Sequence, residues 1–466
     1  MSSLFLAILA VVLTGLNDAL WAQPYGLTER VSNRSLLIDL EAEGPPPTIS
    51  ASGLFADIAT QKPAAGIIPY GVNSKFWSDG IYKTRYLALP GEARIGFSRD
   101  GDWQFPANTV LVKNFYLEFV RGDPTSREII ETRLLVKVGT LQQWRGFSYM
   151  WNEDGSDAEL LADSERLSFI IEDPDRDDGL AEYSYFFPGP QDCNLCHTEA
   201  AGSILGLRTA QLNGLYDYGG TLDHQLRALN HIGVFDEDIG EDYDDFPRWD
   251  NPLDDTAPIQ SRARSYLAAN CGHCHRPGGI ERASIDLRYE TPLADTKTVG
   301  ASPMLGRLDS DDALIINPGN PSNSTILLRM LSFSSNRMPP VATSVIDEKG
   351  TVVIEDWIES LQPSTAVGAR HDQPVSFSLA QNYPNPFNPQ TTIRYSLHAA
   401  GVAELAVYNA LGQRVRTLVA GERAPGRHVV QWDGRGDSGR AVAAGVYFYQ
   451  LRAGGQQEIR KLVLLQ

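Results

Sequence analysis

Two copies of a Cys-x-x-Cys-His pattern constrain the fold of this chain more than any other feature of its sequence. They are Cys193-Asn-Leu-Cys196-His197 and Cys271-Gly-His-Cys274-His275, and they use all four cysteines of the 466 residues. Two thiols on one helical turn can each reach a vinyl group of a porphyrin, and the histidine that follows then faces the iron. The pattern predicts two covalently attached haems c, held by Cys193, Cys196, Cys271 and Cys274 and ligated by His197 and His275.

Two other uses of paired cysteines compete with this interpretation. A four-thiolate zinc site needs no adjacent histidine, and its Cys-x-x-Cys units usually lie about 15 to 20 residues apart. Cys196 and Cys271, in contrast, are 75 positions apart. A redox-active disulfide does not explain two copies that each continue with histidine. We therefore favour haem over zinc and over a disulfide.

The second motif has a candidate for the sixth iron ligand. An amphipathic helix expected over 262–270 leads into this motif, and the downstream segment Asn336-Arg337-Met338-Pro339-Pro340 holds a methionine in a proline-stiffened loop. A thioether opposite imidazole stabilises ferrous iron and raises the reduction potential. We expect Met338 to be the sixth ligand, with a closing helix over 352–361; a buried methionine that only fills space is the alternative.

The first motif has no comparable loop before the second motif begins. Its candidate sixth ligands are two histidines on an expected helix over 223–232 and three methionines: His224, His231, Met150, Met304 and Met330. We select His231, which would make a bis-histidine site of lower potential than the His/Met site. A vacant sixth position is the alternative, and it would leave the iron open to a small ligand such as peroxide.

The N-terminus and the net charge limit location and partners. Residues 1–22 are expected to be a signal peptide, because an apolar run from Leu4 to Leu13 precedes a cleavage-like site at Ala22. That run is shorter than the ~20 residues that span a bilayer, so a membrane anchor is disfavoured, and no later segment is apolar enough to span. The net charge of -18 argues against nucleic acid, and it favours a basic redox protein as partner.

The chain is expected to be multidomain. Residues 23–190 predict a β-rich domain with strands over 110–118, 131–138 and 167–171, and they show no catalytic pairing, phosphate loop or metal cluster. Its aromatic residues are better explained as core than as a carbohydrate groove: Trp77, Trp103, Trp144, Tyr149 and Trp151. A mainly α-helical dihaem region (191–362), a polar linker (363–376) and a small β-sandwich (377–466) follow. The expected sandwich strands are 391–397, 403–409, 413–418, 428–432, 445–453 and 461–465.

From about Gly53 to Leu361 the chain resembles a family of exported dihaem c-type cytochromes whose biochemical role is undefined. The matching segments include GLFAD, ETRLLV, YMWNEDGSDAEL, CNLCHTEAAGSILGL, NHIGVF, YLAANCGHCHRPGG and NRMPP. The resemblance implies a β-rich region followed by two haem-binding segments, and it supports the two cysteine pairs, His197 and His275 position by position. It implies no substrate and leaves the sixth ligand of the first haem open.

Residues 377–466 resemble the C-terminal Ig-like sorting domains of bacterial proteins exported by type IX secretion. The resemblance rests on QNYPNPFNPQTTIRYSL, VYNALGQRVRTL, WDGRGDSGRAVAAGVYFYQL and KLVLLQ. It implies that the export machinery recognises this tail and delivers the protein to the cell surface or the medium. The periplasm is the alternative location, and a plain adhesion module is the alternative for the domain.

Electron transfer is the function that these features favour, because a redox protein needs no general acid or base. Two alternatives stay open. One is a haem-dependent enzyme, either peroxidase-like at the first haem or an oxidoreductase with an organic substrate. The other is a surface carbohydrate-binding protein with a haem relay.

Overall fold

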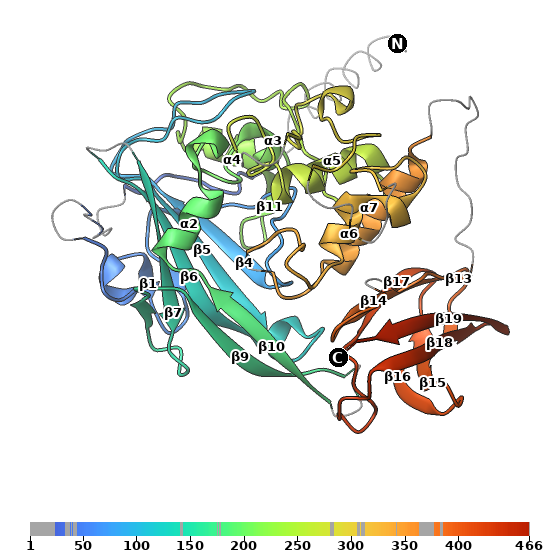
Figure 1. The fold of residues 1–466 in the computed structure, drawn as a ribbon. Coiled ribbons are helices and arrows are strands. Elements are labelled where there is room, and N and C mark those ends of the chain that lie inside the picture. Colours follow the sequence, from blue (N-terminus) through green and yellow to red (C-terminus); the bar gives the residue numbers. More distant parts are fainter. Residues whose placement is uncertain are drawn as a thin grey trace, which may run out of the picture.

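The computed structural model describes residues 24–32, 38, 40, 44–139, 143–174, 176, 179–279, 284–304, 308, 313–341, 343–362, 377–382 and 385–465. The predicted signal peptide (1–22) and the predicted linker (363–376) lie outside these residues. Within the described part of the chain, no helix has both the length and the apolar character needed to cross a membrane. A β-rich region, a helical middle and a C-terminal β-sandwich follow one another along the chain (Figure 1).

A six-stranded antiparallel sheet organises the N-terminal region, with its strands in chain order. The strands are β3 (Ile67–Pro69), β4 (Tyr82–Ala88), β5 (Val110–Glu118), β6 (Arg127–Lys137), β7 (Trp144–Trp151) and β8 (Ala158–Leu160). Successive side chains point to opposite faces. One face packs Val112 and Leu134 against Ile49, and the other turns Leu87 and Leu111 toward the helical middle. Both faces are therefore covered.

Smaller elements complete this region. Strand β1 (Phe55–Asp57) pairs with β2 (Lys62–Pro63), and β9 (Glu165–Glu172) forms a long hairpin with β10 (Leu180–Phe187). Short 3-10 helices occupy Ser50–Ser52, Pro124–Ser126, Glu199–Ala201, Leu293–Asp295 and Pro321–Asn323. Trp103, Tyr149 and Trp151 are buried, whereas Trp77 and Trp144 are half-buried. The three buried rings fill cores, which agrees with the structural interpretation of these aromatic residues.

The helical middle consists of short helices and one small hairpin. The helices are α2 (Pro190–Cys196), α3 (Thr209–Leu212), α4 (Gln225–His231), α5 (Ile259–Asn270), α6 (Thr325–Met330) and α7 (Glu348–Ser360), and the hairpin pairs β11 (Leu215–Asp217) with β12 (Leu222–His224). Helices α5, α6 and α7 share one apolar core that buries Leu267, Leu327 and Trp357. The expected helices over 262–270 and 352–361 are present as α5 and α7, because each buries an apolar stripe.

A second core crosses the predicted boundary between residues 190 and 191. It joins Leu87 and Leu111 of the sheet to Leu212 of α3 and Leu226 of α4. Polar contacts also tie the N-terminal region to α5, since the Trp77 amide donates to Asn270 Oδ1 at 2.7 Å. The β-rich region and the helical middle therefore pack as one body.

The C-terminal domain is a β-sandwich of a three-stranded sheet, ordered β13-β14-β17, and a four-stranded sheet, ordered β16-β15-β18-β19. The strands are β13 (Ser378–Leu379), β14 (Thr391–Leu397), β15 (Gly401–Asn409), β16 (Arg414–Arg423), β17 (Gly426–Trp432), β18 (Gly445–Ala453) and β19 (Gln456–Leu464). The alternating strands predicted there match these bounds within a few residues, except that β16 and β19 are longer.

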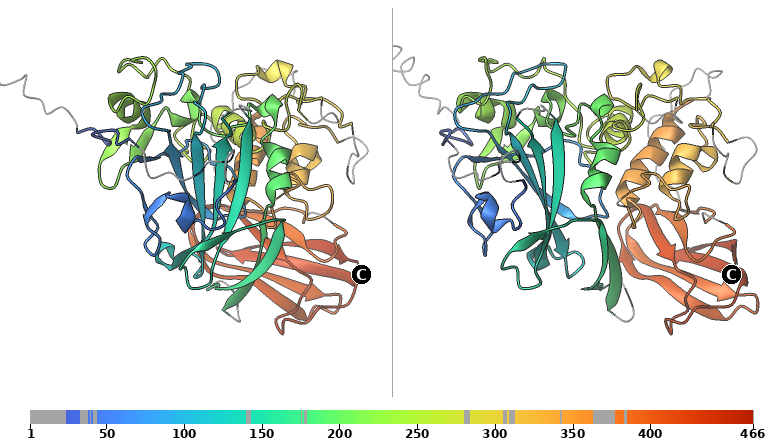
Figure 2. Two further views of the ribbon diagram at one scale, coloured as in Figure 1. Left: turned by 90° about the vertical axis from the view of Figure 1, so that its left-hand side faces the viewer. Right: turned by 60° about the vertical axis from the view of Figure 1, so that its left-hand side comes forward.

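The sandwich lies against helix α7, and Figure 2 shows it beneath the orange helices. Arg394 of β14 pairs with Glu355 at 2.8 Å, and both side chains are largely buried. Arg427 of β17 pairs with Asp356 and, at 2.6 Å, with Glu359. Acidic side chains on the outer face of α7 thus contact two arginines of the C-terminal domain.

Candidate functional site

The first Cys-x-x-Cys-His motif lies on helix α2, which packs directly on strand β7. The helix starts at Pro190, where the Asp192 carboxylate accepts a hydrogen bond from the Gly189 amide at 2.9 Å. A Cβ added to Gly146 of β7 would lie 2.6 Å from Cys193 Sγ and 2.8 Å from Cys193 Cβ. Only glycine leaves room for this approach, so Gly146 sets how closely the motif sits on the sheet.

The histidine of the first motif is held in one tautomer. His197 follows the last residue of α2, and its Nδ1 lies 2.7 Å from the Ser203 carbonyl oxygen. A carbonyl can only accept, so Nδ1 carries the proton and Nε2 keeps its lone pair. Burial lowers the pKa of His197 to about 4, which keeps the ring neutral. A neutral imidazole anchored through its other nitrogen is the form that binds a metal.

The second motif begins where α5 ends. The Cys271 amide donates to the Leu267 carbonyl at 2.8 Å, and the His275 amide donates to the Cys271 carbonyl at 2.9 Å. Cys271 packs against the core of α5, α6 and α7, and burial raises its pKa to about 12. Burial also lowers the pKa of His275 to about 4. Its Nδ1 is buried without a hydrogen-bond partner among the described residues, so a free ring nitrogen is present here as well.

The two motifs meet, although 75 positions separate Cys196 from Cys271. The hydrogen bond between the Cys196 and Cys274 thiols raises the pKa of Cys196 to about 12 and lowers the pKa of Cys274. Cys274 Sγ also lies 3.7 Å from the Leu195 carbonyl. All four cysteines are free thiols. Across the described residues, no three Cys, His, Asp or Glu side chains converge as metal ligands.

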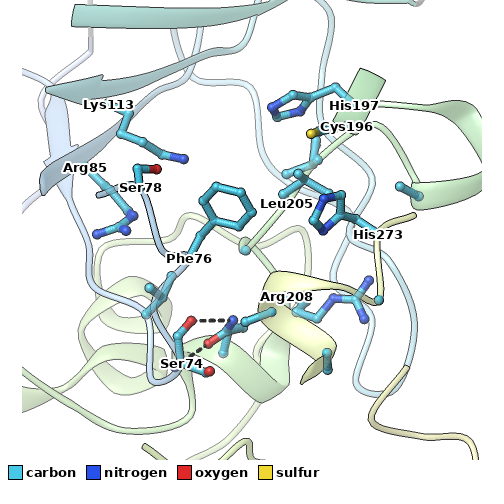
Figure 3. Close-up of a pocket in the computed structure, with 18 of the residues that line it drawn as sticks. Ser74, Phe76, Ser78, Arg85, Lys113, Cys196, His197, Leu205, Arg208 and His273 are labelled. Carbon is cyan, nitrogen blue, oxygen red and sulfur yellow. Dashed lines mark hydrogen bonds between the residues drawn. The ribbon is translucent and has the colours of Figure 1, made fainter. Parts of the chain in front are cut away.

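A large hollow opens beside the first motif (Figure 3). Its cavity volume is about 140 Å³, and its lining includes Cys193, Cys196 and His197. The opposite wall is the sheet, from which Arg85 and Lys113 reach into the hollow. His273 also lines it, and this residue is buried edge-on to the Phe76 ring, with 5.6 Å between ring centroids.

Met338 lies in a separate, smaller hollow. Its amide donates to the Arg329 carbonyl at 3.0 Å, and its neighbours in the hollow include Trp77, Tyr266 and Asp347. His275 does not line this hollow, although the Arg329 charge contributes to the lowered pKa of His275, after burial and the His273 ring. Among the described residues, Met338 and His275 therefore do not line the same hollow.

His231 does not lie with the first motif. It ends α4 and stacks on the Tyr25 ring, with 3.4 Å between ring centroids, and it lines other hollows. His224 stacks on Tyr243 and contacts Asn213 Oδ1 through Nε2 at 2.9 Å. The three methionine candidates are also elsewhere: Met150 packs near the β9–β10 hairpin, Met304 is exposed, and Met330 is in the core of α5 to α7. Among the described residues, none of these five lines the hollow beside the first motif.

Sequence reasoning missed the cationic side chains that face His197. The one feature of the sequence that could have indicated them is the presence of lysine or arginine within strands that are otherwise rich in apolar residues. These positions are Arg85, Lys113 and Arg133. It also missed Gly146 and the Ser203 carbonyl, because backbone contacts between distant segments leave no pattern in the sequence.

The fold and the site define a multidomain protein with a β-rich N-terminal region, a modest helical middle and a C-terminal Ig-like β-sandwich. Residues 389–457 match the FlgD Ig-like domain family. Among solved structures, the chain is similar to FlgD from P. aeruginosa, at 22% identity over 16% of this chain and 59% of that chain, with a TM-score of 0.14. The similarity thus spans less than two thirds of that FlgD chain. No curated protein matches the sequence.

Proposed function

We propose that this protein is an exported dihaem c-type cytochrome that acts in electron transfer at the cell surface or outside the cell. The observation that carries the proposal is the pairing of two Cys-x-x-Cys-His motifs whose thiols are free and whose histidines are neutral and half-buried. Thiols are the groups that form thioethers with porphyrin vinyls, and neutral imidazoles are the groups that bind iron.

Each motif supplies a distinct ligand set to this proposal. Cys193, Cys196 and His197 would hold the first haem, and Cys271, Cys274 and His275 would hold the second, with Met338 as its sixth ligand. When bound, the haems supply one-electron transfer at their irons. The hydrogen bond from Nδ1 of His197 to the Ser203 carbonyl would keep its Nε2 aimed at iron. The hollow beside this motif is lined by both of its cysteines and by His197.

The contact between the motifs favours electron transfer over two independent binding sites. Cys196 and Cys274 would each carry a thioether, and their side chains already touch. The two attachment points therefore hold their cofactors as neighbours. The acidic net charge of -18 suits a basic redox protein as partner, since complementary charge speeds encounter.

A peroxidase-like enzyme is the second candidate, and one observation favours it. Apart from His197 and His273, no histidine or methionine among the described residues lines the hollow beside the first motif. An iron with one protein ligand would be open to a small molecule. His231 stacks on Tyr25 and does not line this hollow, so the proposal for the first iron names His197 alone.

The cofactor content tests the proposal directly. We expect the protein, matured in a host that attaches haem c, to give two haems per chain in a pyridine haemochrome assay and in its intact mass. The double variant C193A/C196A should keep one haem, and so should C271A/C274A. Two low-spin haems that ignore hydrogen peroxide would exclude the peroxidase candidate. A chain that carries zinc, or no covalent haem, would overturn the proposal.

We also propose that the Ig-like domain directs export, as the sorting domains that it resembles do. The FlgD Ig-like match supports the fold of the tail and leaves its role open. Deletion of residues 377–466 should leave the protein inside the cell, while the haem content of the retained protein stays at two. Normal delivery of the shortened chain to the surface or medium would contradict this role.

A further inference from the structure

Three cations form a row across the sheet that faces the first motif. Strands β4, β5 and β6 pair in a register that sets Arg85 opposite Lys113 and Lys113 opposite Arg133. Directly opposed residues of antiparallel strands point to the same face. All three line the hollow beside Cys193 and His197, and Figure 3 shows Lys113 reaching toward the motif. Like charges in this arrangement repel each other and destabilise the sheet.

One of the three cations is neutralised by the protein. Arg133 makes a bidentate pair with Glu131, with Nε to Oε1 at 2.7 Å and Nη2 to Oε2 at 2.8 Å. The Tyr185 hydroxyl donates to the same carboxylate at 2.6 Å. Glu131 is completely buried, and both of its carboxylate oxygens accept hydrogen bonds from Arg133 or Tyr185.

The other two cations have no such partner. Among the described residues, neither Arg85 nor Lys113 makes an ion pair or a hydrogen bond through its side chain. Arg85 is buried, and Lys113 is half-buried with its ammonium 6.0 Å from the centroid of the Phe115 ring. Burial lowers the pKa of both groups, and for Lys113, where Arg85 and Arg133 add repulsion, it falls to about 7. A buried charge without a partner is costly, so the arrangement calls for an anion.

The remaining lining indicates what kind of anion fits. Phe76, Phe115 and Leu205 supply apolar surface beside the cations. The carboxylates in the lining are already engaged, since Asp192 accepts from the Gly189 amide and Glu290 lies 3.5 Å from Arg208. An apolar pocket with a few fixed cations suits a molecule whose body is apolar and whose end is a carboxylate.

We propose that Arg85 and Lys113 form a carboxylate-binding site in the hollow beside the first motif. Two sources supply this chemistry. One is the propionate groups of a haem on the first motif, and this source rests on the proposed function. The other is a free organic acid, which would make the hollow a substrate site and does not depend on haem.

The experiment compares the full-length protein with Arg85→Gln, Lys113→Met and the charge-preserving Lys113→Arg. Arg145→Gln is the matched control, because Arg145 is an exposed cation on the opposite face of the same sheet. One arm titrates succinate by calorimetry and follows the midpoint of thermal unfolding with and without succinate. The other arm measures the midpoint potential of each haem by spectroelectrochemistry.

The two sources give different results. For a free acid, succinate binds and raises the unfolding midpoint; Arg85→Gln and Lys113→Met weaken binding at least tenfold, while Lys113→Arg and Arg145→Gln bind normally. For haem propionates, succinate does not bind, and Arg85→Gln and Lys113→Met lower the potential of the first haem, because a nearby cation favours the reduced state.

One pattern overturns the proposal: no succinate binding, no change in potential, and a higher unfolding midpoint in Lys113→Met because repulsion is relieved. If Arg85→Gln or Lys113→Met does not fold, calorimetry on the wild type, Lys113→Arg and Arg145→Gln still measures whether succinate binds. A preparation without haem contradicts the proposed function alone, and succinate binding then decides whether the carboxylate site exists.

Discussion

Replacing Gly146 by alanine is expected to displace the helix that carries the first motif. The new Cβ would lie 2.6 Å from Cys193 Sγ and 2.8 Å from Cys193 Cβ. Non-bonded heavy atoms pack at about 3.5 to 4.0 Å, so the overlap is about 1 Å. Rotation of the thiol can move Sγ away, but Cβ moves only with the backbone of α2. We therefore expect an overpacking cost of about 1 to 3 kcal/mol.

The displacement should also affect cofactor attachment. Cys193 and His197 belong to the same helical turn and its cap, so a shift of α2 by about 1 Å moves both relative to the sheet. We expect Gly146→Ala to lower the free energy of unfolding in urea and to reduce the haem count toward one per chain. Peptide mapping should locate the loss at the first motif.

Gly401→Ala is the matched control, because no atom lies within 4 Å of a Cβ added at that strand glycine. Its stability and haem content should equal those of the wild type. A Gly146→Ala protein with unchanged stability would refute the close packing of α2 on β7. Lower stability with two intact haems would confirm the packing and refute its role in positioning the motif.

Four further substitutions test separate parts of the site. Met338→Ala should turn the second haem high-spin and lower its potential, because a thioether ligand is lost; an unchanged absorption spectrum would reject Met338 as ligand. His231→Ala should leave both haem spectra unchanged, since the ring stacks on Tyr25 away from the first motif; a change confined to the first haem would restore it as a ligand. Glu131→Gln should lower the free energy of unfolding in urea by about 3 kcal/mol, because it leaves Arg133 unpaired. The double variant Glu131→Gln/Arg133→Met should recover most of this loss. An equal loss in the single and the double variant would show that the two side chains do not stabilise each other. Asp79→Ala should lower the free energy of unfolding by about 1 to 3 kcal/mol, because the Asp79 carboxylate accepts hydrogen bonds from the Ser344 and Val345 amides at 2.6 and 2.8 Å. An unfolding midpoint temperature equal to that of the wild type would show that these hydrogen bonds do not stabilise the protein.

Local patterns were sufficient to predict several elements. Strands β5 and β14 coincide with the expected ranges 110–118 and 391–397, and α5 and α7 appear where apolar residues recur at helical spacing. These elements are predictable because their periods of 2 and 3.6 residues follow from burying one face of a strand or helix. The helix expected from residue 223 instead begins at Gln225, since residues 222–224 pair as strand β12.

Ligand choice was less predictable than secondary structure. His231 was selected from the two histidines of the helix expected over 223–232. In the structure its ring stacks on Tyr25, whereas Leu226 and Leu229 of the same helix belong to the buried core shared with the sheet. A helix presents only one face to a given site, and which face that is depends on the packing of its apolar residues against the rest of the protein.

The sequence by itself determined the chemistry that this protein offers: two pairs of thiols, each followed by a histidine, and a tail with the alternation of an Ig-like sandwich. Only the tertiary structure decided that the two motifs touch through Cys196 and Cys274. It also decided that Arg85 and Lys113 face His197 across one hollow. The physical reason is that spacing along the chain limits which residues share a helical turn, whereas strand register and helix packing decide which distant residues share a cavity.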